Sequence, residues 1–246
     1  MGALRDFSVS QQVGLLFVAL FGLLAIVTVV AFIVTLREGT DADRATREGF
    51  ARDLRAVWVA SVLFWSAWAA GALVSTLLFG VISFIALREL ITITHTRRAD
   101  HRSLLLVFFI VLPVQYLLVA QRHFDLFNVF IPVYVFLAIP VVSAFGNDPQ
   151  RFLERTAKIQ WGVMVCVYGI SHTPALLLLD LPGHTGRGAF LVIYLVAVVA
   201  IAQIAQESAS RQLRRRPVAR AISRSFSWRA WGVGVLRAGL MCALLY

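Results

Sequence analysis

Residues 222–229 carry three serines and two arginines immediately before the last apolar block of the chain. Hydroxyl and guanidinium groups at the start of a helix can bind phosphate, because the first backbone N–H groups of a helix have no partner within it. The candidate phosphate-binding residues are Ser223, Arg224, Ser227 and Trp228. A helix N-cap followed by an aromatic anchor at a membrane interface is the alternative interpretation.

A run of arginines lies just upstream of this segment. Residues 211–216 read Arg-Gln-Leu-Arg-Arg-Arg, and arginine can bind phosphate through two parallel hydrogen bonds. The run is suited either to the anionic headgroups of a membrane or to the phosphates of a substrate. The candidates for the second role are Arg214, Arg215 and Arg216.

Three polar residues lie within or at the end of apolar blocks. His172 follows Ser171 and precedes Pro174, and an ionisable residue at membrane depth indicates either a functional site or a packed, hydrogen-bonded side chain. Gln203 and Gln206 are three residues apart, so they share one face of a helix. That face forms either a helix-helix hydrogen bond or a polar site at the cytoplasmic mouth of the bundle.

Several kinds of site have no signature in this sequence. We find no Walker loop, no glycine-rich dinucleotide motif, no zinc-ligand spacing and no Ser-His-Asp set. The two cysteines, Cys166 and Cys242, lie inside apolar blocks and are interpreted as small buried hydrophobic residues. The formal net charge of +10 is carried by arginines between apolar blocks, which indicates an anionic membrane surface as partner and not a nucleic acid.

The elements that must position these residues are long apolar blocks. The chain is 59% hydrophobic and 15% charged, and about 20 apolar residues are enough for a helix to cross a membrane. The sequence therefore predicts an all-α, polytopic transmembrane helix bundle of seven or eight membrane segments. The blocks are an N-terminal anchor at 13–36, an ambiguous stretch at 57–87, and 104–120, 126–145, 161–179, 189–205 and 231–246.

The stretch 57–87 has two interpretations. It is too long for one upright crossing and too short for two full crossings with a turn. Gly71, near its middle, marks either a bend in one tilted helix or the break of a short hairpin. In the later blocks we expect kinks and not breaks at the prolines, since neighbouring helices can satisfy the freed backbone groups. These prolines are Pro113, Pro132, Pro140 and Pro174.

The charge of the connecting loops predicts the orientation in the membrane. Arginine is concentrated in the loops 88–103, 146–160 and 207–230, whereas 121–125 and 181–188 carry one arginine each. Cytoplasmic loops are usually the richer in Lys and Arg. We therefore expect a multi-pass protein whose basic loops face the cytoplasm.

Several segments, taken in order, resemble one enzyme family. Ala86–Leu90 is similar to the Ala-Leu-[Trp/Arg]-Glu-[Phe/Tyr] element of phosphatidate cytidylyltransferases. Four further stretches are similar to a bacterial subgroup labelled CDP-diglyceride synthetase-like: 96–102, 130–134, 151–162 and 168–176. The resemblance covers the chain from about Arg52 to the end, and it implies a bacterial inner-membrane protein.

The resemblance implies a reaction and its partners. Members of the family convert CTP and phosphatidate to CDP-diacylglycerol and pyrophosphate with the help of Mg²⁺. In this chain Ser223, Ser227 and Trp228 match the family's nucleotide-phosphate loop, and residues 214–216 would add positive charge. A homo-oligomer is an open alternative to a monomer.

Two departures from the family pattern set a further expectation. Gln203 or Gln206 stands where the family has an aspartate, and a neutral amide is a poor substitute for a Mg²⁺-binding carboxylate. The family's His-Gly-Gly and Asp-Arg-x-Asp cluster, which supplies most of the metal-binding acids, does not occur up to Tyr246. We therefore expect a truncated member that is weakly active or inactive by itself. The alternative is a non-catalytic membrane protein that binds anionic lipid or a partner helix bundle.

Overall fold

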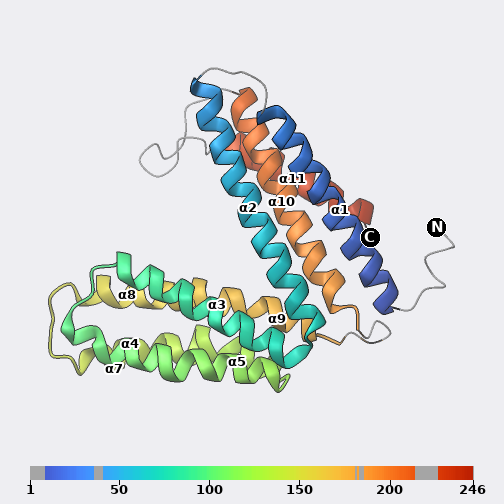
Figure 1. The fold of residues 1–246 in the computed structure, drawn as a ribbon. Helices are drawn as coiled ribbons and strands as arrows, with labels where there is room; N and C mark the ends of the chain where they lie inside the picture. The colour runs from blue at the N-terminus through green and yellow to red at the C-terminus, as the bar shows by residue number, and fades with distance from the viewer. Residues whose placement is uncertain (1–8, 36–40, 181, 183–185, 214–226, 246) are drawn as a thin grey trace. The chain divides into compact units, whose positions relative to one another are not determined.

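The fold was analysed in a computed structural model, which describes residues 9–35, 41–180, 182, 186–213 and 227–245. The elements in these ranges are all helices (Figure 1). They divide into two compact units, 1–188 and 189–246. The predicted all-α class is confirmed, and the candidate residues Arg214, Arg215, Arg216, Ser223 and Arg224 lie outside the described residues.

The ambiguous apolar stretch is broken at Gly71. Helix α2 (Asp41–Ala69) ends just before this residue and α3 (Ala72–Ile93) begins just after it. Gly71 has φ of 89°, a backbone conformation that glycine adopts at no steric cost. The structure therefore confirms the break at Gly71, and a single tilted helix through 57–87 is wrong.

Helix α1 (Val9–Thr35) packs on α2 through aromatic rings. The ring of Phe17 lies 4.8 Å from that of Trp65, and the ring of Phe21 lies 5.5 Å from that of Trp58. The indole N–H of Trp58 also donates to the hydroxyl of Thr28 at 2.9 Å. This hydrogen bond satisfies the indole N–H, which would otherwise face an apolar surrounding, while the Thr28 hydroxyl itself donates to the Leu24 carbonyl at 2.7 Å.

The main bundle consists of α3 and three long helical rods. One π-helical turn interrupts each of the three rods. Figure 1 shows α3, α5, α7 and α8 side by side, and the contacts between these helices agree. The first rod consists of α4 (His101–Leu106), a π-turn at Val107–Val111 and α5 (Leu112–Ala120). The second rod consists of α6 (Phe124–Val129), a π-turn at Phe130–Val135 and α7 (Phe136–Ala144). The third rod consists of α8 (Phe152–Val163), a π-turn at Met164–Gly169 and α9 (Ile170–Leu178).

The rods remain helical through all four internal prolines, as expected. A proline leaves the carbonyl four residues earlier without its usual donor. The Asn128 carbonyl, four residues before Pro132, accepts a hydrogen bond from the Tyr168 hydroxyl at 3.3 Å. The Phe136 carbonyl, four residues before Pro140, accepts one from the Gln160 side-chain amide at 2.8 Å. Side chains of the third rod thus satisfy backbone groups that prolines free in the second.

We predict that Gln160→Leu and Tyr168→Phe each lower the free energy of unfolding by roughly 0.6–2 kcal/mol, because each leaves a membrane-embedded carbonyl without a donor. The measurement is equilibrium unfolding in mixed micelles. Thr92→Val is the control, since its hydroxyl bonds only to a carbonyl of its own helix. Equal stabilities of all three variants would contradict the prediction.

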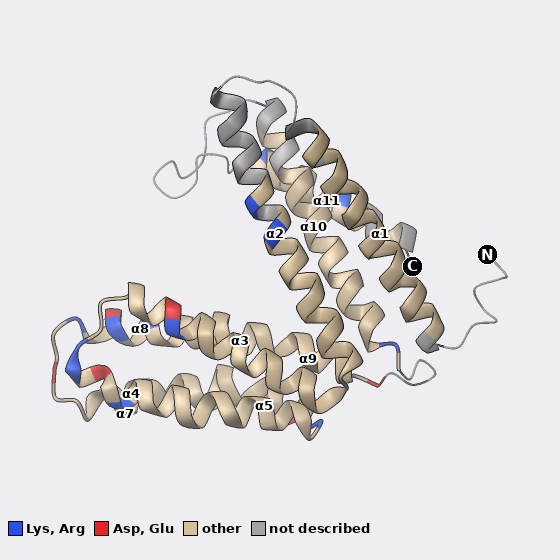
Figure 2. Ribbon diagram, viewed as in Figure 1, with Lys and Arg blue, Asp and Glu red and all other residues tan. Residues whose placement is uncertain are grey.

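The packing of the bundle is that of a membrane protein. Its core is a cluster of buried aliphatic and aromatic side chains that includes Leu87, Val111, Ile131, Ile139 and Ile159. Many large apolar side chains point outward, and Figure 2 shows the charged residues of the bundle at its two ends. Six described helices are long and apolar enough to span a membrane, and the apolar helix Leu54–Ala69 is shorter. The chain is a polytopic transmembrane helix bundle.

The second unit contains α10 (Gly188–Leu213) and α11 (Trp228–Leu245). A Cβ atom added at Gly234 of α11 would lie 3.0 Å from the carbonyl oxygen of Ala202 and 3.2 Å from the Cβ of Gln206. The absence of a side chain at Gly234 therefore allows these two helices to approach closely.

The three basic loops predicted at 88–103, 146–160 and 207–230 are shorter in the structure. Helix α3 continues to Ile93, and α8 begins at Phe152, within the predicted loop 146–160. Helix α10 continues to Leu213, within the predicted loop 207–230. Several charges of the predicted loops therefore lie on helices, where an apolar face can bury part of them.

Candidate functional site

Ser227 and Trp228 lie at the start of α11. The Ser227 hydroxyl accepts a hydrogen bond from the backbone N–H of Ala230 at 3.2 Å, which is the geometry of an N-cap. The indole of Trp228 is exposed and lies edge-on to Trp231, with ring centres 6.0 Å apart. This geometry matches the capping interpretation, while the phosphate-binding role of both residues stays a prediction.

Gln203 and Gln206 lie on α10 in different surroundings. Gln206 is half-buried and contacts the face of α11 at Gly234, whereas Gln203 is exposed within the described residues. Gln206 therefore packs against α11, and Gln203 is the more accessible of the two amides. Both interpretations of this pair stay predictions.

His172 lies in a packed aromatic cluster of the main bundle. Its Nδ1 atom is 2.7 Å from the Tyr168 carbonyl, and its ring lies 4.5 Å from the ring of Tyr168 and 4.9 Å from that of Phe127. The neighbouring Ser171 hydroxyl accepts from the Gln115 amide at 3.3 Å. The packed, hydrogen-bonded interpretation of His172 agrees with these contacts.

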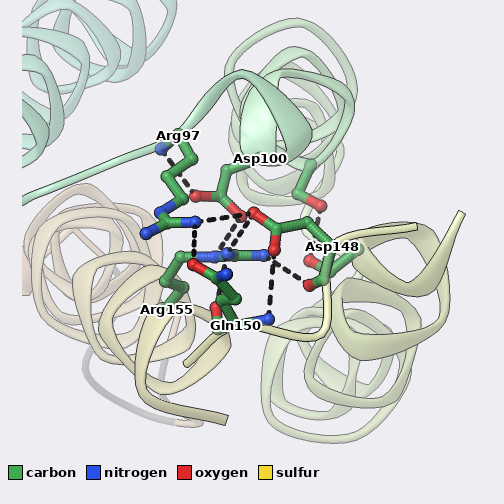
Figure 3. A network of polar contacts seen from close by, with 7 residues as sticks. Arg97, Asp100, Asp148, Gln150 and Arg155 are labelled. Atoms are coloured by element: carbon green, nitrogen blue, oxygen red, sulfur yellow. Dashed lines mark hydrogen bonds and ion pairs between the residues drawn. The ribbon is translucent and has the colours of Figure 1, made fainter. Parts of the chain in front are cut away.

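A network of charged residues that sequence reasoning missed lies at one end of the bundle (Figure 3). It consists of Arg97, Asp100, Asp148, Gln150 and Arg155, and we name it the arginine clasp. The Arg155 side chain is 6% exposed and the Asp100 side chain 2%. The Nε of Arg155 donates to Asp100 at 3.0 Å, and its terminal nitrogens donate to the Asp148 carboxylate at 2.8 Å and to the Asp148 carbonyl at 3.0 Å.

Arg97 closes the clasp from the solvent side. Its guanidinium donates to the Asp148 carboxylate at 3.3 Å and to the Gln150 side chain at 2.8 Å. Its backbone N–H donates to Asp100 at 2.9 Å, which holds the short 3₁₀ turn Arg98–Asp100 at the start of the first rod. The clasp therefore joins three segments: the turn before α4, the loop before α8 and α8 itself.

Close backbone packing supports the clasp. A Cβ atom added at Gly146 would lie 2.7 Å from the Ala99 carbonyl oxygen, so the two loops meet only because residue 146 has no side chain. The hydroxyls of Ser103 and Ser143, on the rods that these loops join, lie 2.7 Å apart. Asn147 and Arg151 have φ of 53° and 50°, which turns the chain sharply between the second and third rods.

The sequence of this chain matches a known protein family. The sequence model of the cytidylyltransferase family matches residues 50–245, from within α2 to the end of α11. The chain belongs to the cytidylyltransferase family. It is also 33% identical over 147 residues to the uncharacterized protein YnbB of Escherichia coli strain K12. That match covers 59% of this chain and 46% of YnbB, so the chain spans about half the length of this relative. No solved structure matches.

The clasp of this cytidylyltransferase-family protein does not fit a Mg²⁺ ion. Magnesium binds carboxylates that keep free oxygen lone pairs, whereas both clasp carboxylates accept from guanidinium groups. Among the described residues no group of three His, Cys, Asp or Glu side chains could hold a metal ion. The contacts of the clasp connect two loops to α8, and Mg²⁺ stays an expectation from the family.

Asp148 is the titratable member of the clasp that reaches solvent. The backbone N–H of Gln150 has the largest effect and holds the pKa of Asp148 below its usual value, with the guanidiniums of Arg97 and Arg155 acting in the same direction against partial desolvation. A carboxylate with a lowered pKa stabilises the folded state above its unfolded pKa of about 3.9. That stabilisation is lost as the pH falls toward the lowered folded value.

We predict that the melting temperature of the wild-type protein exceeds that of Asp148→Asn at pH 7, and that the difference shrinks as the pH falls below about 4. The measurement is thermal unfolding of both proteins in the same detergent from pH 7 to pH 3. A difference that stays constant over this range would show that the ionised carboxylate contributes nothing.

Proposed function

We propose that this protein transfers the cytidylyl group of CTP to phosphatidate. The proposal rests on one observation: the cytidylyltransferase family model covers five of the six described membrane-spanning helices as well as α11. A lipid substrate suits a catalyst whose helices lie in the bilayer, because the headgroup of phosphatidate stays at the membrane surface while its acyl chains remain in the hydrocarbon. A phosphatidate oxygen would attack the α-phosphorus of CTP, and the bond to pyrophosphate would break.

In this proposal the residues before α11 bind the nucleotide. The hydroxyls of Ser223 and Ser227 would donate to the phosphates, and Arg214, Arg215 and Arg216 would offset their negative charge. Bound Mg²⁺ would neutralise the phosphates further. Because Gln203 and Gln206 are neutral and the clasp carboxylates are engaged, we propose that turnover by the 246-residue chain is slow.

The test is conversion of radiolabelled CTP by the full chain in nanodiscs that contain phosphatidate and Mg²⁺. We expect slow, phosphatidate-dependent formation of CDP-diacylglycerol, which the double variant Ser223→Ala/Ser227→Ala abolishes. Ser66→Ala is the matched control, since its hydroxyl lies on α2 and bonds within its own helix. No product above background from the wild-type chain would overturn the activity, and product from the double variant would overturn the site.

Carboxylate substitutions on α10 sharpen this test. If the family's aspartate corresponds to one of the two glutamines, Gln203→Asp or Gln206→Asp is expected to raise the rate of turnover, because a carboxylate binds Mg²⁺ far better than an amide does. The more exposed Gln203 is the first choice. A fall in rate for both variants would contradict the proposed correspondence.

The second candidate is a non-catalytic membrane protein that binds anionic lipid. The arginine clasp favours it, because this end of the bundle is held together by ion pairs while further arginines remain at its surface. Retention of anionic lipid without CTP-dependent chemistry would support this candidate.

In either case we propose a bacterial inner-membrane location with the basic loops in the cytoplasm, which labelling of an Arg98→Cys variant from each side would test.

A further inference from the structure

The arginine clasp leaves a surplus of positive charge beside it. Within the clasp, the charges of Arg97 and Arg155 are matched by those of Asp100 and Asp148. The same turn carries Arg98 and Arg102, which are exposed, and neither forms an ion pair with any described carboxylate. The clasp is thus neutral, and the two arginines next to it are available to an anion.

The positions of these two arginines favour a single ligand. They lie four residues apart at the start of the first rod, Arg98 in the 3₁₀ turn and Arg102 in the first turn of α4, so two cations lie close together at this end of the rod. Two like charges in this arrangement repel each other. An anion bound between them would replace the repulsion by two charge-assisted contacts.

The backbone that carries the two arginines is held in place. Asp100, between them in sequence, is fixed by Arg155 and by the Arg97 backbone. The guanidinium of Arg102 already donates to the Phe145 carbonyl at 3.2 Å, which orients its remaining N–H groups. A preorganised arginine loses less conformational entropy when it binds a ligand.

The surroundings indicate that the anion belongs to a lipid. The Phe145 side chain, beside the contact with Arg102, is 65% exposed, and Leu153 on α8 is 80% exposed. Both lie at the end of membrane-spanning helices, where apolar side chains meet acyl chains and cations meet headgroups. A soluble phosphate would use the arginines but gain nothing from this apolar rim.

We propose that Arg98 and Arg102 bind the phosphate monoester of phosphatidate. The inference rests on the proposed function for its substrate and adds two residues that bind the lipid headgroup. A monoester carries close to two negative charges at neutral pH and presents three oxygens, which two guanidinium groups can share. A phosphodiester lipid carries one charge and has fewer free oxygens, so the pair should prefer the monoester.

The experiment measures lipid selectivity by electron spin resonance. The full chain is reconstituted in phosphatidylcholine bilayers with spin-labelled phosphatidate or spin-labelled phosphatidylglycerol, and the fraction of motionally restricted label gives relative association constants. We expect phosphatidate to be favoured, and Arg98→Gln/Arg102→Gln to weaken its association at least about tenfold, the size expected for losing one charged hydrogen bond. Arg98→Lys/Arg102→Lys should retain a preference for anionic lipid and lose most of the discrimination between monoester and diester.

Two controls make the result specific. Arg55→Gln removes one exposed cation whose only described bond is to its own helix, and Arg122→Gln removes one that pairs with Asp180; both should leave the selectivity unchanged. Equal selectivity of the Gln double variant and the wild type, or competition by free inorganic phosphate as strong as by phosphatidate, would overturn the proposal. This assay needs neither CTP nor turnover, so an inactive chain that binds phosphatidate would contradict only the proposed function.

Discussion

Replacing Arg155 by Leu is expected to lower the free energy of unfolding by about 3–5 kcal/mol, the range for removing one partner of a buried ion pair. The substitution would leave the Asp100 carboxylate 2% exposed and without its guanidinium. It would also remove the donors of the Asp148 carbonyl and the Gln150 carbonyl. The measurement is equilibrium unfolding of the purified variant in mixed micelles.

The matched control is Lys158→Leu, one turn further along α8. Lys158 forms an exposed pair with Glu154 at 2.6 Å, and such pairs contribute less than about 1 kcal/mol. The double variant Arg155→Leu/Asp100→Leu should recover part of the loss, since it removes the isolated charge. If both single variants lost the same small amount, the clasp would contribute no more than a surface ion pair.

Gly146→Val is expected to produce the second large effect, a loss of roughly 1–3 kcal/mol or more. A Cβ atom at this position would lie 2.7 Å from the Ala99 carbonyl oxygen and 3.0 Å from the Ala99 Cβ. The obstacle is backbone, so no rotation of a neighbouring side chain can relieve it. The two loops must separate, and the association constant for phosphatidate should fall together with the stability.

Gly22→Val provides the comparison for this prediction. A Cβ atom at Gly22 of α1 would meet no atom within 4 Å, so the same change in volume should be tolerated there. Unfolding in mixed micelles and spin-label selectivity would be measured on both variants. A Gly146 variant as stable as the Gly22 variant would show that the loops can separate at no cost.

The overall architecture could be predicted from the sequence because it depends on local properties. Apolar block length indicated the membrane helices, and Gly71 marked the break between α2 and α3. The resemblance of separate segments to one family indicates the same family whose model matches residues 50–245. None of these inferences depends on contacts between segments that are distant in the sequence.

The clasp could not be predicted in the same way. The loop predicted at 146–160 contains Arg155, although the spacing of Arg155 to Ile159 and Val163 places it on the buried face of α8. That periodicity was a usable signal for a buried arginine. The partners Asp100 and Asp148, however, lie 55 and seven residues away in sequence, and only the folded structure shows that they meet.

The bonds to the proline-freed carbonyls constrain how the bundle can move. The Gln160 side chain bonds to the Phe136 carbonyl and the Tyr168 hydroxyl to the Asn128 carbonyl, so the second and third rods run antiparallel. The two hydrogen bonds that connect the rods are eight residues, or about 12 Å, apart. Sliding one rod along the other would break both hydrogen bonds together. The two rods should therefore shift as one rigid hairpin, and a displacement at the clasp would be transmitted to the aromatic cluster around His172.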